Sequence, residues 1–155
     1  MSWTRLHKHV GIALLILATS AFLVHAIGSR DDQPLVQVGT VRLGMQQVEL
    51  SQKLGSADRK ETVNGIQRYE YAGGHLLIDV DSSGLVTGVT GEVLQIDGEA
   101  LGSELSPQEL LAALGPPSRL DTSSDGQVVM TYPEVDLAVI RFSETRRLLF
   151  RLGNE

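Results

Sequence analysis

The chain has 155 residues and a mass of 16.8 kDa, which suits one compact domain or two very small ones. It contains no cysteine, so disulfides, thiolate nucleophiles and cysteine-ligated zinc or iron–sulfur clusters are excluded. Only two of the 13 basic residues precede residue 28, whereas all 19 acidic residues follow it. The part of the chain after residue 28 therefore has 11 basic and 19 acidic residues, a net charge of −8. This negative charge would repel a nucleic-acid backbone.

The first predicted element is the apolar segment VGIALLILATSAFLVHAIG, residues 10–28. Its length matches the roughly 17–25 residues that a transmembrane helix needs. Because basic residues precede it, we predict a signal-anchor of a single-pass membrane protein, with residues 1–9 as a cytoplasmic tail and the C-terminal domain outside the cytoplasm. The alternative is a signal peptide cleaved at Ala26, which would give a secreted or periplasmic protein. Residues 29–35 are expected to form a polar linker.

An internal repeat with a period of about 60 residues occupies the rest of the chain. VQVGTVRLG at 36–44 matches LQIDGEALG at 94–102. Further matching pairs are Glu49 with Glu109, Leu54 with Leu114, Gly55 with Gly115, Tyr71 with Tyr132 and Leu76 with Leu137. Such a unit cannot bury its apolar face well alone. We therefore predict a first αβ repeat over residues 36–92 and a second over residues 93–155.

Each repeat is predicted to contain one short helix. In the second repeat, Ser106 is a favourable N-cap, Pro107 fits the first helical position and Glu109 completes an S-x-x-E capping box. Gly115 can end this helix in the left-handed conformation. The first repeat keeps the matching stop at Gly55 but has a weaker helix start.

Strand-like segments separated by turn signals follow each helix. They are IQRYEY (66–71), HLLIDV (75–80) and LVTGV (85–89) in the first repeat, and QVVMTY (127–132), DLAVIRF (136–142) and RLLFRL (147–152) in the second. The predicted fold class is α+β, with an N-terminal transmembrane helix followed by two tandem helix-plus-antiparallel-meander repeats that form a two-layer α/β sandwich.

The repeat also predicts which strand faces are buried. Tyr69 and Tyr71 share one face of their strand and match Met130 and Tyr132, so this face is expected to belong to the core and not to a recognition site.

The opposite face of the sheet is the predicted partner-contact surface. Its candidate residues are Leu77, Ala138, Ile140 and Phe142, which are apolar and would form an exposed patch. Two alternatives stay open: the two units cover each other there, or a one-residue bulge turns Phe142 inward.

The motif DVDSSG at 79–84 resembles the opening of a calcium loop, so Asp79, Asp81 and the nearby His75 are the candidates for a metal site. The loop lacks its acidic twelfth ligand, because Thr90 stands at that position. A hairpin turn explains the motif better, and no metal is assigned.

Catalytic chemistry is not indicated by the sequence. Beyond residue 28 there is a single histidine, and neither a nucleophile turn nor a phosphate-binding glycine loop is present. We therefore predict no catalytic residues, no cofactor and no enzyme. Near the C-terminus, Arg146, Arg147 and Arg151 are either a basic patch or, as we prefer, the solubilising charges of a final edge strand.

The pattern G-M/L-x-x-x-E-L-x-x-x-L-G-x-x-x-R, followed by a strand that ends in tyrosine, resembles the envelope domain of the outer-membrane β-barrel assembly lipoproteins (the SmpA/OmlA, or BamE-like, type). The tandem arrangement is similar to that of the β-lactamase inhibitory proteins. The matching residues, within 36–152, are Gly44, Met45, Leu54, Gly55, Tyr71, Leu105, Leu114, Gly115, Pro117 and Tyr132. The resemblance implies a protein that acts by binding other proteins. Without a cysteine after the apolar segment, lipoprotein attachment is not expected.

These features together predict an exported, membrane-tethered, non-catalytic protein–protein interaction module of the cell envelope, whose partner is a protein in the envelope or the extracellular space. One alternative is an inhibitor or regulator of a secreted enzyme that acts through the loops 72–75 and 133–136. Another is a weak calcium- or ligand-responsive sensor that uses Asp79, Asp81 and His75.

Overall fold

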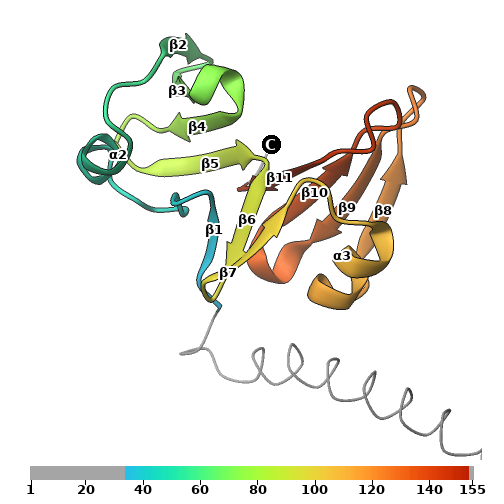
Figure 1. The fold of residues 1–155 in the computed structure, drawn as a ribbon. Coiled ribbons are helices and arrows are strands. Elements are labelled where there is room, and N and C mark those ends of the chain that lie inside the picture. The colour runs from blue at the N-terminus through green and yellow to red at the C-terminus, as the bar shows by residue number, and fades with distance from the viewer. Residues whose placement is uncertain (1–33, 154–155) are drawn as a thin grey trace, which may run out of the picture. The chain divides into compact units, whose positions relative to one another are not determined.

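The structure is a computed structural model that describes residues 34–153 (Figure 1). By its contacts the chain divides into two compact units. The described part of the first unit consists of Pro34 and residues 106–116, and the second unit consists of residues 35–105 and 117–153. All strands of the described residues belong to the second unit.

The first unit contains helix α3 (Pro107–Leu114), which has the predicted capping box. The Ser106 hydroxyl accepts a hydrogen bond from the Glu109 amide at 3.3 Å, and the Glu109 carboxylate accepts one from the Ser106 amide at 2.9 Å. The hydrogen bond from the Ser106 side chain holds the pKa of Glu109 below its ordinary value. The helix ends at Gly115, whose amide donates to the Leu111 carbonyl at 2.9 Å. The predicted start and stop of this helix are confirmed.

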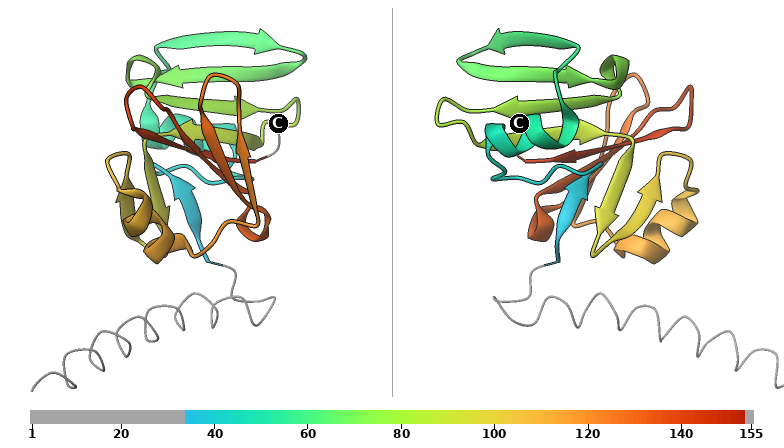
Figure 2. Two further views of the ribbon diagram at one scale, coloured as in Figure 1. Left: turned by 90° about the vertical axis from the view of Figure 1, so that its right-hand side faces the viewer. Right: turned by 60° about the vertical axis from the view of Figure 1, so that its left-hand side comes forward.

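An eight-stranded antiparallel sheet dominates the second unit. Its spatial order is β2 (Arg59–Val63), β3 (Ile66–Tyr71), β4 (Leu76–Val80), β5 (Val86–Gly91), β11 (Leu148–Leu152), β10 (Leu137–Arg141), β9 (Val128–Tyr132) and β8 (Arg119–Thr122). Strands β2–β5 form the first half of this sheet and β8–β11 form the second half. The two halves meet where β5 pairs with β11. In Figure 2 the strands of the two halves run in clearly different directions, as expected for a strongly twisted sheet.

A second sheet of three strands was not predicted. It has the order β1 (Val36–Val38), β6 (Val93–Ile96) and β7 (Glu99–Gly102), all antiparallel. Strands β6 and β7 are joined by Asp97 and Gly98, which both have positive φ, as a two-residue type I′ hairpin requires. The same turn chemistry, Asn64-Gly65, joins β2 to β3.

Helix α2 (Gln47–Leu54) lies in the second unit and has a weaker start than α3, as predicted. The residue before it, Gln46, makes no side-chain capping bond. The amide of Gln47 instead donates to the carbonyl of Gly84 at 2.8 Å, in the turn between β4 and β5. The helix ends at Gly55, which has φ +75°. A backbone contact from the sheet therefore takes the place of a cap.

The core of the second unit lies on one face of the eight-stranded sheet, which we call the inner face. Tyr69 and Tyr71 are 4% and 7% exposed, so the prediction that they belong to the core is confirmed. The other buried strand residues of this face are Ile78, Val80, Val86, Val89, Tyr132, Leu137, Val139, Leu148, Phe150 and Leu152. Residues that alternate with them point to the opposite, outer face.

The predicted two-layer α/β sandwich is wrong, because the described residues are mostly β-strand. The two α-helices have eight residues each, which corresponds to about 12 Å of helix. Strand β1 packs against β5 and β11, and its Val38 is fully buried. The middle of the inner face is therefore covered by the three-stranded sheet, where the sequence interpretation placed helices.

The predicted membrane anchor is corrected as well. Among residues 34–153, no helix is long and apolar enough to cross a bilayer. Helices of eight residues fall far short of the roughly 17–25 that a span requires. Residues 10–28 and the cleavage point at Ala26 lie outside the described residues. The signal-anchor, single-pass and membrane assignments are accordingly withdrawn.

Replacing Phe150 with alanine tests the assignment of the inner face. Phe150 is fully buried on the central strand β11, so Phe150→Ala should lower the free energy of unfolding by about 3–5 kcal/mol. Its neighbour Leu149 points to the outer face and is partly exposed, so Leu149→Ala should cost less than about 2 kcal/mol. Urea denaturation measures both. Equal losses would show that the two faces of β11 are assigned wrongly.

Candidate functional site

The predicted partner-contact residues all lie on the outer face of the eight-stranded sheet and are partly exposed. Ala138 and Ile140 alternate along β10 with the buried Leu137 and Val139. Strand β10 pairs with β9 and β11 in an unbroken register, so no bulge in this strand turns Phe142 inward. The outer face is therefore where sequence reasoning placed it.

Three of the predicted residues, Ala138, Ile140 and Phe142, belong to the second half of the sheet. Ile140 lies opposite Val129 of β9 and Leu149 of β11. Phe142 follows two residues later, and its amide donates to the Arg147 carbonyl at 3.1 Å in the turn that joins β10 to β11. We define the apolar cluster as Val129, Ile140, Phe142 and Leu149, with Ala138 at its border. Val129 and Leu149 were not among the predicted residues.

Leu77 is not brought together with this cluster. It lies opposite Thr90, which lies opposite Arg151, which lies opposite Ala138. Two strands thus separate Leu77 from β10, a distance of about 14 Å at ordinary strand spacing. Leu77 therefore stands apart from the second half of the outer face.

At the positions that match Val129 and Ile140, the first half of the outer face carries an ion pair. Arg68 of β3 makes a bidentate ion pair with Asp79 of β4, with N–O distances of 2.8 and 2.9 Å. The hydrogen bond from Asp79 raises the pKa of Arg68, although burial acts in the opposite direction. In the repeat alignment, Arg68 and Asp79 match Val129 and Ile140. Equivalent sheet positions thus carry opposite chemistry.

The three metal candidates are engaged separately. Asp79 pairs with Arg68, and the Nδ1 atom of His75 lies 3.2 Å from the Glu92 carboxylate. Asp81 accepts hydrogen bonds from Ser83 and Leu85 in the hairpin between β4 and β5, and the Ser83 hydroxyl is the main cause of its lowered pKa. No group of three metal-ligating side chains forms among the described residues.

The C-terminal arginines do not lie on an edge strand. Strand β11, which contains Arg151, is flanked by β5 and β10, so the edge-strand interpretation is wrong. Arg147 pairs with Glu92 at 3.2 Å and with Glu104 at 3.3 Å. Arg146 has φ +58° in the turn before β11.

The two loops of the inhibitor hypothesis have matching positions in the sheet. Short 3-10 turns, Ala72–Gly74 and Pro133–Val135, directly follow the tyrosines that end β3 and β9. Ala72 and Asp136 adopt left-handed φ values of 52° and 51°. The inhibitor function of these loops stays a prediction.

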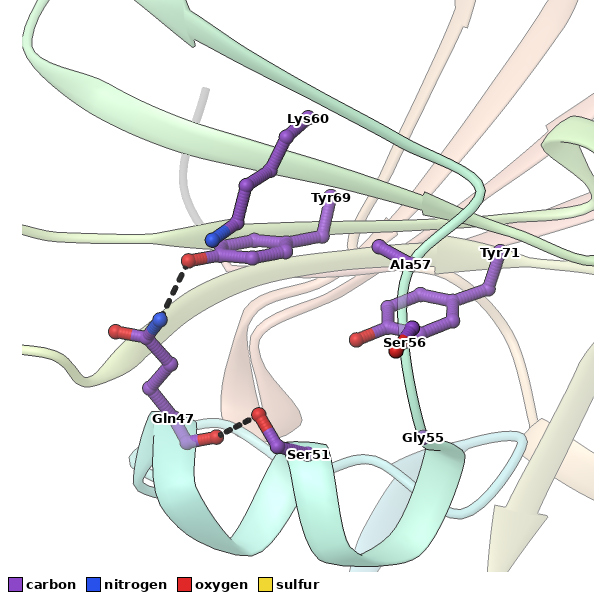
Figure 3. Close-up of a pocket in the computed structure, with 8 residues that line it drawn as sticks. All are labelled: Gln47, Ser51, Gly55, Ser56, Ala57, Lys60, Tyr69 and Tyr71. Atoms are coloured by element: carbon purple, nitrogen blue, oxygen red, sulfur yellow. Dashed lines mark hydrogen bonds between the residues drawn. The ribbon is translucent and has the colours of Figure 1, made fainter.

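A polar cleft lies on the inner face of the first half of the sheet, between helix α2 and strands β2 and β3 (Figure 3). Its volume is about 450 Å³. The lining consists of two tyrosines, one lysine and small or polar residues: Gln47, Ser51, Gly55, Ser56, Ala57, Lys60, Tyr69 and Tyr71. A volume of this size is in the range of small-molecule sites.

A hydrogen-bond network fixes one wall of the cleft. The Tyr69 hydroxyl accepts from Gln47 Nε2 at 2.6 Å and donates to Gln67 Oε1 at 2.7 Å. The Lys60 ammonium lies over the Tyr69 ring, 4.7 Å from its centroid, at the distance of a cation–π contact. Helix and sheet are thus tied together through one side chain.

The Tyr71 hydroxyl forms no hydrogen bond with any residue of the described chain. Figure 3 shows it pointing from β3 toward the space between Tyr69 and the helix. Burial, with a smaller contribution from Tyr69, raises the pKa of Tyr71, so its proton is retained at neutral pH. Sequence reasoning assigned both tyrosines to the core and missed that their hydroxyl groups reach a cleft.

The fold is that of a mostly β protein with a large antiparallel sheet. No protein-family model and no curated protein matches the chain. Among solved structures, the crystal structure of a DUF4309 family protein (YjgB) from Bacillus subtilis is similar, with 13% sequence identity, 70% of this chain and 78% of that chain covered, and a TM-score of 0.42. A similarity of this size carries no argument about function.

Two phenylalanine substitutions test the network. Tyr69→Phe leaves the side-chain amide of Gln47 and the side-chain oxygen of Gln67 without their shared hydrogen-bond partner. It should therefore lower the free energy of unfolding by about 1–2 kcal/mol. Tyr71→Phe removes a hydroxyl without such bonds and should change it by less than about 0.5 kcal/mol. Thermal and urea unfolding measure both variants. A larger loss for Tyr71→Phe would contradict the described network.

Proposed function

We propose that this protein is a non-catalytic protein–protein interaction module that binds its partner through the second half of the outer face. The observation that carries the proposal is the apolar cluster of Val129, Ile140, Phe142 and Leu149 on a partly exposed sheet face. Apolar side chains gathered on an open face mark interaction sites more often than chance.

The fold itself does not require these apolar residues. The matching positions in the first half are Arg68, Asp79, Asp81 and Gly88, and that half forms the same antiparallel pairings. An outer sheet face that faces water is normally polar. The apolar residues of the second half therefore have a reason that lies outside the sheet, and a partner surface supplies it.

The surroundings of the cluster suit an interface. Arg119 pairs with Asp121 at 2.6 Å on the edge strand β8, and Arg147 pairs with Glu92 just before the start of β11. A polar rim around an apolar centre with aromatic residues and arginine is the common composition of protein interfaces. We infer a partner that presents apolar side chains flanked by polar groups of both signs.

The resemblance to envelope domains of the SmpA/OmlA type supports the same class of function, because those families act by binding proteins. The separate engagement of His75, Asp79 and Asp81 supports a binding role over a catalytic one, since catalytic groups act in concert within one site.

A crosslinking experiment tests the proposal. A photo-crosslinking amino acid at Thr131, beside Ala138 on the outer face, should capture a protein partner in cells, and mass spectrometry identifies it. With the purified partner, Ile140→Asp should weaken binding by about 100-fold or more, because a carboxylate would be desolvated at the centre of the contact.

Val48→Asp is the matched control. Val48 is 60% exposed on helix α2, away from the outer face, so binding should change by less than about twofold. Thr131→Arg is a second test, because Thr131 is already polar and the larger side chain would block the surface without disturbing the core. Unchanged affinity in folded Ile140→Asp and Thr131→Arg proteins would refute the proposed surface.

A further inference from the structure

We propose that the cleft between α2 and strands β2 and β3 is a binding site for a carboxylate group. The carboxylate would be held by the ammonium of Lys60 together with the hydroxyls of Ser56 and Tyr71. This site lies on the inner face of the first half, so it is independent of the partner surface on the second half of the outer face.

The positive charge of Lys60 is available to a ligand. Within residues 34–153 it forms no ion pair, and no acidic residue lines the cleft in this part of the chain. The nearest acidic residues in sequence are occupied elsewhere: Asp58 accepts from the Gly73 amide at 3.0 Å, and Glu61 pairs with Arg59 at 3.4 Å. In a chain with a net charge of −6, a concave site with a cation and no anion is an unusual combination.

Hydroxyl donors accompany the cation. Neither Ser56 nor Tyr71 makes a side-chain hydrogen bond within the described residues, and both line the cleft together with Lys60 and Tyr69 (Figure 3). The network from Gln67 through Tyr69 to Gln47 holds the Tyr69 ring in place before a ligand arrives. A preformed wall reduces the ordering cost of binding.

The donor set favours a carboxylate over a phosphate. A carboxylate carries one negative charge, which a single lysine balances, and its two oxygens accept charge-assisted and neutral hydrogen bonds. A phosphate dianion is usually held by arginine forks or several cations, and no arginine lines this cleft among the described residues.

The polar lining is particular to the first repeat. In the repeat alignment, Gln47, Ser51, Ser56, Lys60 and Tyr69 match Pro107, Leu111, Pro116, Leu120 and Met130. Every one of these polar positions is therefore apolar in the second repeat. Only the shared Gly55/Gly115 and Tyr71/Tyr132 pairs keep their identity, which indicates that the fold does not demand the polar groups.

A nuclear magnetic resonance titration of the full chain tests the site. Sodium propanoate should give saturable shifts of the amide signals of Gly55, Ser56 and Tyr71, and its neutral counterpart propanamide should bind at least about tenfold more weakly. A tripeptide with a free C-terminal carboxylate and its amidated form make up a second pair. Tighter binding of the free peptide than of propanoate would assign the carboxylate to a peptide terminus, and equal affinity would assign it to a small organic acid.

Lys60→Gln should weaken propanoate binding by at least about tenfold, since it removes the charge and keeps most of the side chain. Lys53→Gln is the matched control, because Lys53 belongs to α2, pairs with Glu49 at 3.4 Å and does not line the cleft. Three results would overturn the proposal: no saturable shift up to about 50 mM propanoate, enough to detect millimolar binding; equal binding of propanoate and propanamide; or undiminished binding by Lys60→Gln.

Discussion

The pairing of β5 with β11 is the interaction on which the rest of the structure depends. Three residue pairs, from Gly91–Phe150 to Val89–Leu152, join the two halves of the eight-stranded sheet. The junction is tightly packed: a Cβ atom at Gly91 would lie 2.8 Å from Val38 Cγ1, and one at Gly153 would collide with the Thr87 carbonyl oxygen. Glycine is therefore needed on both sides of the seam, once for β1 to pack and once for β11 to end against β5.

This junction explains why the residues of the inner face are constrained by packing, whereas those of the outer face are not. On the inner face, residues from both halves and from β1 share one core, so the apolar residues there are constrained by packing. On the outer face, the same cross-strand positions hold the Arg68–Asp79 ion pair in one half and Val129 beside Ile140 in the other. Where the fold leaves such freedom, the choice of residues is informative about function.

Sequence patterns predicted the local elements well and the assembly poorly. The capping box at Ser106 and the alternation along β3, β4, β9, β10 and β11 depend on neighbouring residues, and these elements formed as expected. The three-stranded sheet was missed although Asp97-Gly98, which joins β6 to β7, is a strong hairpin signal. Strand β1 comes from the start of the first predicted repeat, and β6 and β7 come from the start of the second, so the pairing of β1 with β6 is non-local and periodicity does not encode it.

The features of the candidate site also divide into those that the local sequence predicted and those that depend on the assembly of the strands. The partly exposed outer face followed from period-two alternation, which also placed Ala138 and Ile140 together. The separation of Leu77 from them depends on the strand order, which the sequence does not display. The cleft was missed because the rings of Tyr69 and Tyr71 belong to the core, whereas their hydroxyl groups lie at its edge and border the cleft. Comparing Lys60 with Leu120 and Gln47 with Pro107 would have drawn attention to it.

Native-state hydrogen exchange of the amides shared by β5 and β11, residues 89–91 and 150–152, tests the central claim most directly. If the two halves form one cooperative sheet, these amides exchange only through global unfolding, with the same free energy of opening as the amides between β3 and β4 and between β9 and β10. Markedly faster exchange at the β5–β11 seam than within either half would show that the halves separate before they unfold, and would contradict the single sheet.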